Sequence, residues 1–157
     1  MGKVIADAQV TLVYGGASRG LMGVLADAVM NAGGQVIGVM PQTLVHMEIA
    51  HPKVSELKIV PDLHVRKSTM ATLADAFIAL PGGAGTLEEL LEMITWLQLG
   101  LHNKPIALLN TEGYYDPLVQ LFEASVREQF IPQELISRII VETNVDTLWA
   151  RLQSAAS

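Results

Sequence analysis

Three glycines in four residues lie at the centre of residues 80–90, which read LPGGAGTLEEL. The apolar run DAFIAL comes before them and the helix-spaced run LEMITWLQL after them, so they join an expected strand to an expected helix. A helix N-terminus carries unpaired N–H groups and the positive end of the helix dipole, and glycines let the backbone approach a ligand. We therefore expect Gly82, Gly83, Gly85 and Thr86 to surround an anion, namely a phosphate group. The alternative is a tight turn, although such a turn needs only one glycine.

Two common phosphate-binding motifs do not fit this loop. No Lys-Ser or Lys-Thr pair follows the glycines, as a Walker motif requires, and the G-x-G-x-x-G spacing of dinucleotide-binding folds is absent. The loop is therefore expected to bind phosphate through its backbone and the helix that follows.

Two carboxylates, Glu88 and Glu89, come directly after the glycines. One interpretation is structural, because Thr86 and Glu89 have the spacing of a capping box and acidic side chains suit the first turn of a helix. The other is catalytic, because a carboxylate beside a bound phosphate is repelled by it unless it acts on water or on a sugar. The sequence leaves both interpretations open.

Arg66 and Lys67 form the only adjacent basic pair in the chain, and they follow the expected strand LKIVP. An arginine can bind a phosphate through two N–H groups or orient a carboxylate. The alternative is a solvated helix face. A second glycine-rich turn, YGGASRG, follows the expected strand at 10–16.

The remaining chemistry-bearing residues match no known catalytic or metal-binding spacing. The four histidines show neither H-x-H nor H-E-x-x-H, and there is no cysteine, so we expect neither a metal site nor a disulfide. Ser18 does not lie in a G-x-S-x-G elbow, which argues against a serine hydrolase. We expect Met22, Met70 and Met93 to fill the core.

The elements that position these residues alternate between strand and helix along the chain. This alternation predicts parallel strands with right-handed crossovers, in a Rossmann-like doubly wound α/β sheet with helices on both faces. Ligands bind outside the carboxyl ends of such strands, where both glycine turns are expected. We expect strands at 10–16, 35–41, 57–61, 76–81, 104–110 and 138–142, helices at 20–34, 64–75, 86–100 and 114–130 (the last capped by Asp116, with Pro117 first), and a short terminal helix capped by Asn144 or Asp146.

Composition narrows the class of protein. The 157 residues suit one domain, 1–157, and half of them are apolar. The net charge of −6 argues against a sequence-independent grip on nucleic acid. No apolar run approaches the roughly 20 residues of a membrane span, and the N-terminus lacks the features of a signal peptide. We therefore expect a cytoplasmic protein that binds neither nucleic acid nor membrane.

Several motifs together resemble one known family. PGGAGTLEE fits the pattern P-G-G-x-G-T-x-x-E of the LONELY GUY family, whose members are often described as lysine decarboxylases. YGGASRGLMG resembles the family's first glycine turn, and DLHVRK resembles its M-H-x-R-K segment, with Leu63 where methionine is common. ITWLQLGLHNKPIALLN and GYYDPL also follow the family pattern, so the resemblance covers essentially the whole chain.

The resemblance implies a phosphoribohydrolase. Such enzymes cleave the N-glycosidic bond of cytokinin riboside 5′-monophosphates and release the free base and ribose 5-phosphate, and many bacterial members also act on AMP. The implied partner is a small-molecule nucleotide, AMP or N6-prenyl-AMP, with no cofactor. A homodimer is also implied. The apolar helix LLEMITWLQL would suit its interface, although burial within one chain would explain that helix equally well.

Carried over by motif, the resemblance implies that Arg66 and Glu89 are the catalytic pair. Glu89 would stabilise the positive charge that develops on the sugar and activate water. Arg66 would either keep Glu89 ionised or contact the leaving base. The implied substrate-binding residues are Glu48, Lys67, Gly82, Gly83, Gly85, Thr86, Glu88 and Thr95.

The chain departs from the family pattern at its start. Members usually begin with a strand of the type V-C-V-Y-C-G-S-S and then a helix, and MGKVIADAQ resembles the end of that helix. We therefore expect the family's first strand and its nucleotide-binding turn to be absent from this chain. A Rossmann-like protein that binds a nucleotide or molybdenum cofactor without cleaving it is the alternative function. A structural remnant without activity is a third.

Overall fold

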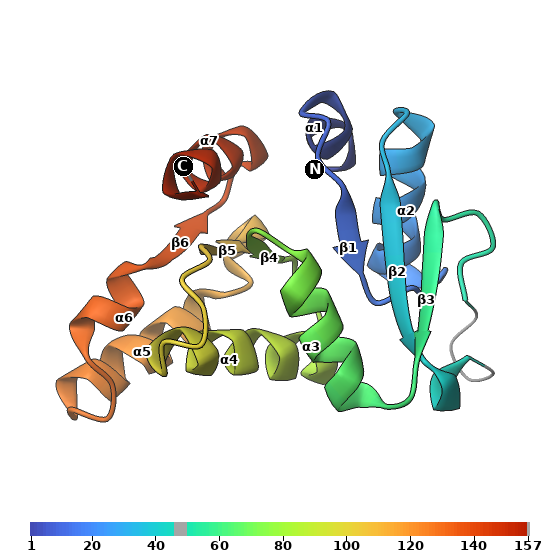
Figure 1. The fold of residues 1–157 in the computed structure, drawn as a ribbon. Coiled ribbons are helices and arrows are strands. Elements are labelled where there is room, and N and C mark those ends of the chain that lie inside the picture. Colours follow the sequence, from blue (N-terminus) through green and yellow to red (C-terminus); the bar gives the residue numbers. More distant parts are fainter. Residues whose placement is uncertain (46–49, 157) are drawn as a thin grey trace. The chain divides into compact units, whose positions relative to one another are not determined.

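The structure is a computed structural model that describes residues 1–45 and 50–156. They form two compact units, Met1–Ala74 and Asp75–Ser157, and each unit has its own parallel sheet (Figure 1). Both sheets have three strands, in the order β1-β2-β3 in the first unit and β4-β5-β6 in the second.

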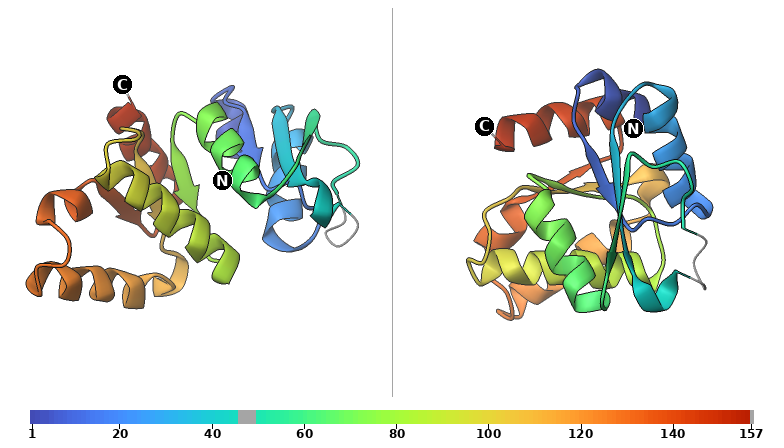
Figure 2. Two further views of the ribbon diagram at one scale, coloured as in Figure 1. Left: turned by 60° about the horizontal axis from the view of Figure 1, so that its bottom comes forward. Right: turned by 45° about the vertical axis from the view of Figure 1, so that its right-hand side comes forward.

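The first unit is built around β2, whose sequence VIGVMP is almost wholly apolar. Val36, Val39 and Met40 are fully buried, as expected for a strand covered on both faces. Helices α2 and α3 lie on opposite faces of this sheet (Figures 1 and 2). The elements are α1 (Gly2–Asp7), β1 (Leu12–Tyr14), α2 (Gly20–Asn31), β2 (Val36–Pro41), η1 (Gln42–Leu44), β3 (Glu56–Val60) and α3 (Leu63–Leu73).

The second unit is built around β5, in which all four residues are buried. Helix α7 covers one face of this sheet, and α4 and α5 lie on the other (Figure 1). The elements are β4 (Phe77–Ala79), α4 (Ala84–Gln98), β5 (Ile106–Leu109), η2 (Thr111–Gly113), α5 (Asp116–Arg127), α6 (Gln133–Ser137), β6 (Ile139–Glu142) and α7 (Val145–Ala156).

The expected fold class is confirmed. All six expected strands are present and every strand pair is parallel. The segment MGKVIADAQ contains a helix, α1, as expected. The prediction of a single domain over residues 1–157 stays a prediction.

Local expectations are corrected at three places. Helix α4 begins at Ala84, two residues before the expected start. Asp116 is the first residue of α5 and not its cap, because its carboxylate accepts a hydrogen bond from Asn110 Nδ2 at 2.7 Å. The short helix α6 was not expected, since five residues are too few to show a helical period.

The terminal helix has the expected cap. Asn144 Oδ1 accepts hydrogen bonds from the backbone N–H groups of Asp146 and Thr147 at 2.8 and 3.2 Å, so Asn144, rather than Asp146, caps α7.

Candidate functional site

The glycine-rich loop in the second unit runs from the end of β4 into the start of α4. Gly83 precedes the first helical residue, and no side chain caps this helix end. The first backbone hydrogen bond of the helix runs from Leu87 N to the Gly83 carbonyl at 3.1 Å. The N–H groups of Ala84, Gly85 and Thr86 therefore have no partner within the helix itself, which makes this end suited to an anion.

The glycines of this loop differ in what the fold requires of them. A Cβ atom on Gly82 would overlap the Thr86 side chain, so the fold itself requires glycine there. A Cβ atom on Gly83 or Gly85 would meet no atom within 4 Å in the described part of the chain. Neither of these two residues has a left-handed backbone, so neither lack of space nor backbone conformation explains why these positions are glycine. The close approach of a bound molecule to the backbone would explain it.

Glu88 and Glu89 lie in the second turn of α4. Glu88 is exposed and Glu89 is half-buried. The capping-box interpretation is wrong, because Thr86 is the third residue of the helix and the first turn holds no acidic residue. Thr86 and Glu89 therefore do not form a capping box at the start of α4.

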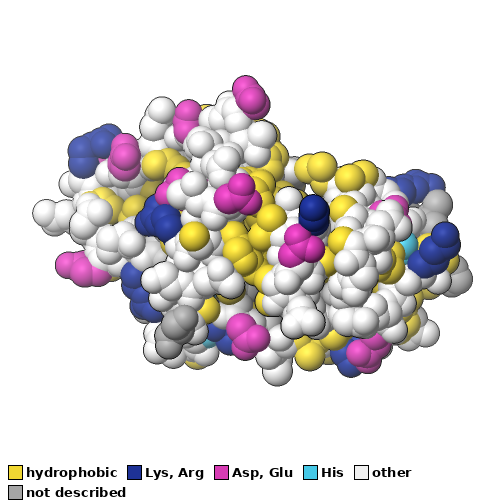
Figure 3. Space-filling view, turned by 90° about the horizontal axis from the view of Figure 1, so that it is seen from above, with side chains coloured by type: hydrophobic (Ala, Val, Ile, Leu, Met, Phe, Trp, Pro, Cys, Tyr) yellow, Lys and Arg dark blue, Asp and Glu magenta, His cyan; other side chains and the backbone are white. Residues whose placement is uncertain are grey.

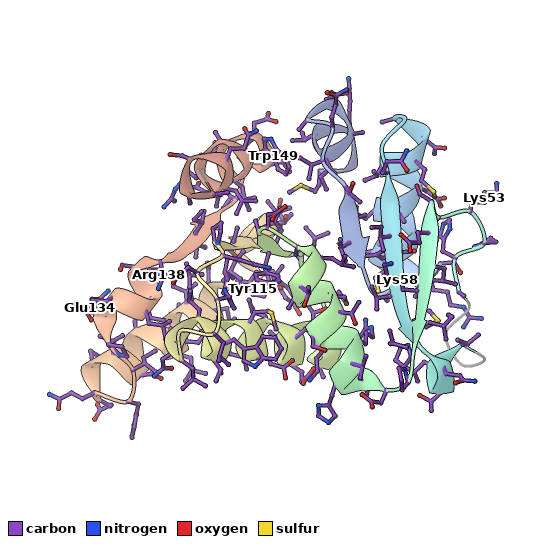
Figure 4. All side chains as sticks on the ribbon, viewed as in Figure 1. Lys53, Lys58, Tyr115, Glu134, Arg138 and Trp149 are labelled. Carbon is purple, nitrogen blue, oxygen red and sulfur yellow. The ribbon has the colours of Figure 1, made fainter. Side chains whose placement is uncertain are left out.

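Two tyrosines hold the backbone of the glycine loop. Tyr114 Oη donates a hydrogen bond to the Gly82 carbonyl at 2.5 Å, and Tyr115 Oη donates to the Leu80 carbonyl at 2.6 Å. Their rings meet edge to face with centroids 5.1 Å apart. Tyr115, labelled in Figure 4, is fully buried, and this burial together with the neighbouring Tyr114 raises its pKa above the usual 10.0. We call Tyr114 and Tyr115 the tyrosine clamp.

The tyrosine clamp is held in turn by Asn110, which follows β5. Asn110 Oδ1 accepts a hydrogen bond from the Tyr115 backbone N–H at 2.7 Å, while its Nδ2 donates to Asp116. Asn110 is itself buried. Sequence reasoning gave these residues no role in the site. The sequence signals were two adjacent tyrosines shortly after an expected strand and the match of GYYDPL to the family pattern.

Arg66 lies at the first glycine turn of the first unit. It is on the first turn of α3, a helix capped by Asp62, whose Oδ1 accepts a hydrogen bond from the Val65 N–H at 2.9 Å. Arg66 Nε donates to the Val39 carbonyl at 3.1 Å. A Cβ atom on Gly15 would overlap the Arg66 guanidinium, so glycine at this turn makes room for it.

The basic pair is therefore not a solvated helix face. Arg66 is half-buried and Lys67 is only 8% exposed, and a lysine is rarely buried without a structural or functional role. Within residues 1–74 the structure thus brings Arg66 to the carboxyl end of β1, where ligands bind in folds of this class.

The remaining predicted site residues are Glu48 and Thr95. Glu48 lies outside the described residues. Thr95 is exposed on α4, and its Oγ1 donates to the Leu91 carbonyl at 2.7 Å. It follows Thr86 by nine residues, which is about 14 Å along a helix axis. Within residues 75–157 the structure therefore groups Gly82, Gly83, Gly85, Thr86, Glu88 and Glu89 at one helix end, with Thr95 farther along the same helix.

A buried histidine, His51, lies beside the first glycine turn and contacts the exposed Asp27. His51 is 5% exposed, and its Nδ1 accepts a hydrogen bond from the Lys53 N–H at 3.3 Å, so its Nε2 donates to Asp27 Oδ1 at 3.2 Å. The His51 N–H also donates to the Gly16 carbonyl at 2.9 Å. The neighbouring Tyr14 has a pKa raised to about 12, because burial and the Asp27 carboxylate both disfavour the phenolate.

Charges of both signs occur on the surface. On the face drawn in Figure 3, lysine and arginine side chains are interspersed with acidic ones. Among the described residues, no helix combines the length and the apolar character that crossing a bilayer requires.

The sequence comparisons with known proteins agree on one protein family. A family model described as "Possible lysine decarboxylase" matches residues 22–152. A cytokinin riboside 5′-monophosphate phosphoribohydrolase of Rhodococcoides fascians is 49% identical over 155 residues, which are 98% of this chain and 78% of that protein. One from Arabidopsis thaliana is 55% identical over 131 residues, which are 83% of this chain, and the match spans 62% of the relative's length.

The fold has known counterparts as well. The molybdenum cofactor binding protein of Rippkaea orientalis matches with a TM-score of 0.74 and 21% identity, over 99% of this chain and 83% of that one. This likeness confirms the Rossmann-like fold and carries no argument about function. The family model covers most of the chain and the relatives share about half of its residues over most of their own lengths. The chain therefore belongs to the LONELY GUY family of cytokinin riboside 5′-monophosphate phosphoribohydrolases.

Proposed function

We propose that this protein hydrolyses the N-glycosidic bond of adenosine 5′-monophosphate, plain or N6-prenylated. Water adds to C1′ of the ribose, the bond from C1′ to the base breaks, and the products are the free base and ribose 5-phosphate. The single observation that carries this proposal is a glycine loop at an uncapped helix start, with two glycines that the fold does not require, followed by a carboxylate about one turn along the helix. Relatives that are about half identical and carry this enzyme name support it.

In this proposal the phosphate of the nucleotide binds the start of α4. Gly83 and Gly85 let it approach the backbone, and the N–H groups of residues 84–86 donate to its oxygens. The tyrosine clamp fixes the carbonyls of Leu80 and Gly82, so the loop is held in shape before the substrate arrives. A nucleotide anchored at its phosphate has its ribose held for attack.

Glu89 would act on the sugar. It follows Thr86 by three residues, which is about 4.5 Å along the helix, so it lies beyond the phosphate-binding end. Its carboxylate would stabilise the positive charge that develops at C1′ and take a proton from the attacking water. Glu88 would line the same end of the helix.

In the first unit, the family resemblance assigns Arg66 as the second proposed catalytic residue and Lys67 as a proposed substrate contact. The bond from Arg66 Nε to the Val39 carbonyl fixes the guanidinium beside the first glycine turn. Thr95 lies two turns farther along α4 than the glycine loop, which suits contact with the base end of the nucleotide. Glu48 remains a predicted substrate contact.

The first experiment incubates the protein with AMP and, separately, with isopentenyladenosine monophosphate, and follows free base by chromatography. We expect release of base by the parent chain and a fall in turnover of about 10²–10⁴-fold in Glu89→Gln, because the general base is lost. Glu123→Gln, an exposed carboxylate on α5, is the matched control and should keep parental turnover. Full activity of Glu89→Gln would show that another group does the chemistry.

The same assay tests the alternative of a non-catalytic nucleotide carrier. Calorimetry with AMP would then show binding by the parent chain while no base appears from either substrate. The family description as a lysine decarboxylase gains no support from the site, because that chemistry needs a lysine in a pyridoxal phosphate site and the loop carries glycines and carboxylates instead.

We also propose that the protein is a cytoplasmic homodimer. A cytoplasmic location suits a substrate that is a nucleotide monophosphate. Helix α4 is explained largely by burial within its own unit, through Leu90, Met93, Ile94 and Leu97. Helix α5 supports the dimer better, because it has no buried residue and exposes 60% of Leu121.

A further inference from the structure

A pocket lies at the amino-terminal edge of the sheet β4-β5-β6. It has a volume of about 390 Å³ and lies wholly within residues 75–157. Its polar lining comes from the stretch before β5, the stretch before β6, and α7. The six polar residues are Asn103, Lys104, Ser137, Arg138, Arg151 and Ser154. Because the strands are parallel, this edge is opposite to the edge that carries the glycine loop.

The charge of this pocket stands out from its surroundings. Residues 75–157 contain only four basic side chains, and three of them, Lys104, Arg138 and Arg151, line the pocket. None of the lining residues is acidic, although acidic residues outnumber basic ones in this unit and in the whole chain. Arg151 is paired with Glu142 outside the lining, but the lining itself carries only positive charges, in contrast to the acidic protein as a whole.

The charged groups of Arg138 and Arg151 are held by side-chain contacts, and the backbone at Lys104 is fixed by a hydrogen bond. Arg138 Nη2, on the segment that leads into β6 (Figure 4), donates to Asn103 Oδ1 at 3.2 Å. Arg151 Nη1 pairs with Glu142 Oε1 at 2.6 Å, outside the lining. The Lys104 backbone N–H donates to His102 Nδ1 at 3.1 Å, which fixes the chain where the lysine begins. The pocket is therefore organised before any ligand binds.

We propose that this pocket binds a small phosphorylated metabolite. Two guanidinium groups and one ammonium group suit the oxygens of a phosphate, and the hydroxyls of Ser137 and Ser154 add further donors. The remaining lining includes Leu97 and Ile140, which give the organic part of the ligand an apolar surface. This site is separate from the proposed nucleotide site, and the inference does not depend on the hydrolase activity.

A competing role for the same cations is structural. The last turns of α4 and α7 reach this pocket, and cations stabilise the carbonyl ends of helices. The two roles differ in one measurable respect. A structural cation affects stability alone, whereas a ligand-binding cation also affects the affinity for phosphate.

The test titrates the full chain with inorganic phosphate and with pyrophosphate at constant ionic strength, and follows backbone amide resonances by NMR. We expect saturable shifts at Ser137 and Ser154 that are distinct from any shifts at Gly83 and Gly85. Lys104→Gln and Arg138→Gln should each weaken this binding by about tenfold, because each removes a charge-assisted hydrogen bond. Arg127→Gln, the fourth basic residue of the unit, lies outside the pocket and should bind as the parent does.

Three outcomes would overturn the proposal. One is the absence of saturable shifts at Ser137 and Ser154 in the parent. Another is an equal loss in Arg127→Gln, which would indicate general attraction between charges. The third is a lower melting temperature of Lys104→Gln and Arg138→Gln with unchanged phosphate affinity, which would assign the cations to helix ends. Arg138→Lys keeps the charge and provides a second variant if Arg138→Gln does not fold.

Discussion

At the scale of single residues, the glycine loop contains one glycine that the fold requires and two that it does not require. Gly82 has no room for a side chain because Thr86 is in the way, while Gly83 and Gly85 have open space beside them. Sequence alone could mark all three as unusual but could not tell them apart, because the difference is made by the Thr86 rotamer and the first turn of α4.

We predict opposite effects for alanine at two of these positions. Gly85→Ala should leave the free energy of unfolding within about 1 kcal/mol of the parent, since a helical alanine replaces a helical glycine without a clash. It should raise KM for AMP by about tenfold, because a methyl group then intrudes on the phosphate oxygens. Gly82→Ala should lower the free energy of unfolding by about 1–3 kcal/mol through overlap with Thr86.

Urea denaturation and steady-state kinetics on both variants check these effects. If Gly85→Ala binds AMP as tightly as the parent does, the start of α4 does not bind the phosphate.

A second residue-scale prediction concerns Tyr14 and pH. Its pKa is about 12 in the folded protein, whereas a tyrosine in the unfolded chain loses its proton near 10.0. The unfolded state therefore releases this proton first, and the free energy of unfolding falls as the pH rises from about 10 to about 12. Tyr14→Phe should show a smaller fall over this range, measured as the urea midpoint at successive pH values.

At neutral pH the Tyr14→Phe variant should be at least as stable as the parent. The Tyr14 hydroxyl is buried without a hydrogen-bond partner among the described residues, so its removal relieves a desolvation penalty of about 1–3 kcal/mol. A variant that is clearly less stable at neutral pH would reveal a partner for the hydroxyl, such as a bound water.

At the scale of elements, apolar runs and glycine boundaries were enough to predict all six strands. The start of α4 was not predictable, because Ala84 and Gly85 enter the helix although glycine is a poor helix former. That two-residue shift also excludes a capping box formed by Thr86 and Glu89. The contacts of the tyrosine clamp could not be predicted from the sequence for a different reason. Tyr114 and Gly82 are 32 residues apart in sequence, and only the folded sheet brings them together.

The tyrosine clamp gives an element-scale prediction with two separable parts. Tyr115→Phe should lower the free energy of unfolding by about 1–3 kcal/mol, because it removes the hydrogen bond that the hydroxyl of the buried Tyr115 donates to the partly buried Leu80 carbonyl. Tyr114 is exposed by 48%, so Tyr114→Phe should change stability by less and act on the loop that it holds.

The expected kinetic result for Tyr114→Phe is a higher KM for AMP with a smaller change in kcat. Thermal melts together with initial-rate kinetics distinguish the two tyrosines. Equal losses of stability in both variants would contradict the separation proposed for them.

At the scale of the whole molecule, we predict that α5 contributes to a dimer interface. Leu121 and Phe130 are 60% and 80% exposed, in and just after a helix with no buried residue. Light scattering coupled to size exclusion should give about twice the chain mass of 16.9 kDa, and Leu121→Glu should reduce it toward one chain. Glu123→Gln on the same helix is the matched control. A parental mass in Leu121→Glu would place the interface elsewhere.

The order of the strands has a consequence for the synthesis of the protein. In each sheet every strand pairs with its nearest strand along the chain, and the two sheets occupy consecutive stretches of sequence. All strands of the first sheet are therefore translated before any strand of the second sheet. No late strand has to insert between two earlier ones, so each sheet can form during translation from contacts of short sequence separation, which is the condition for fast folding.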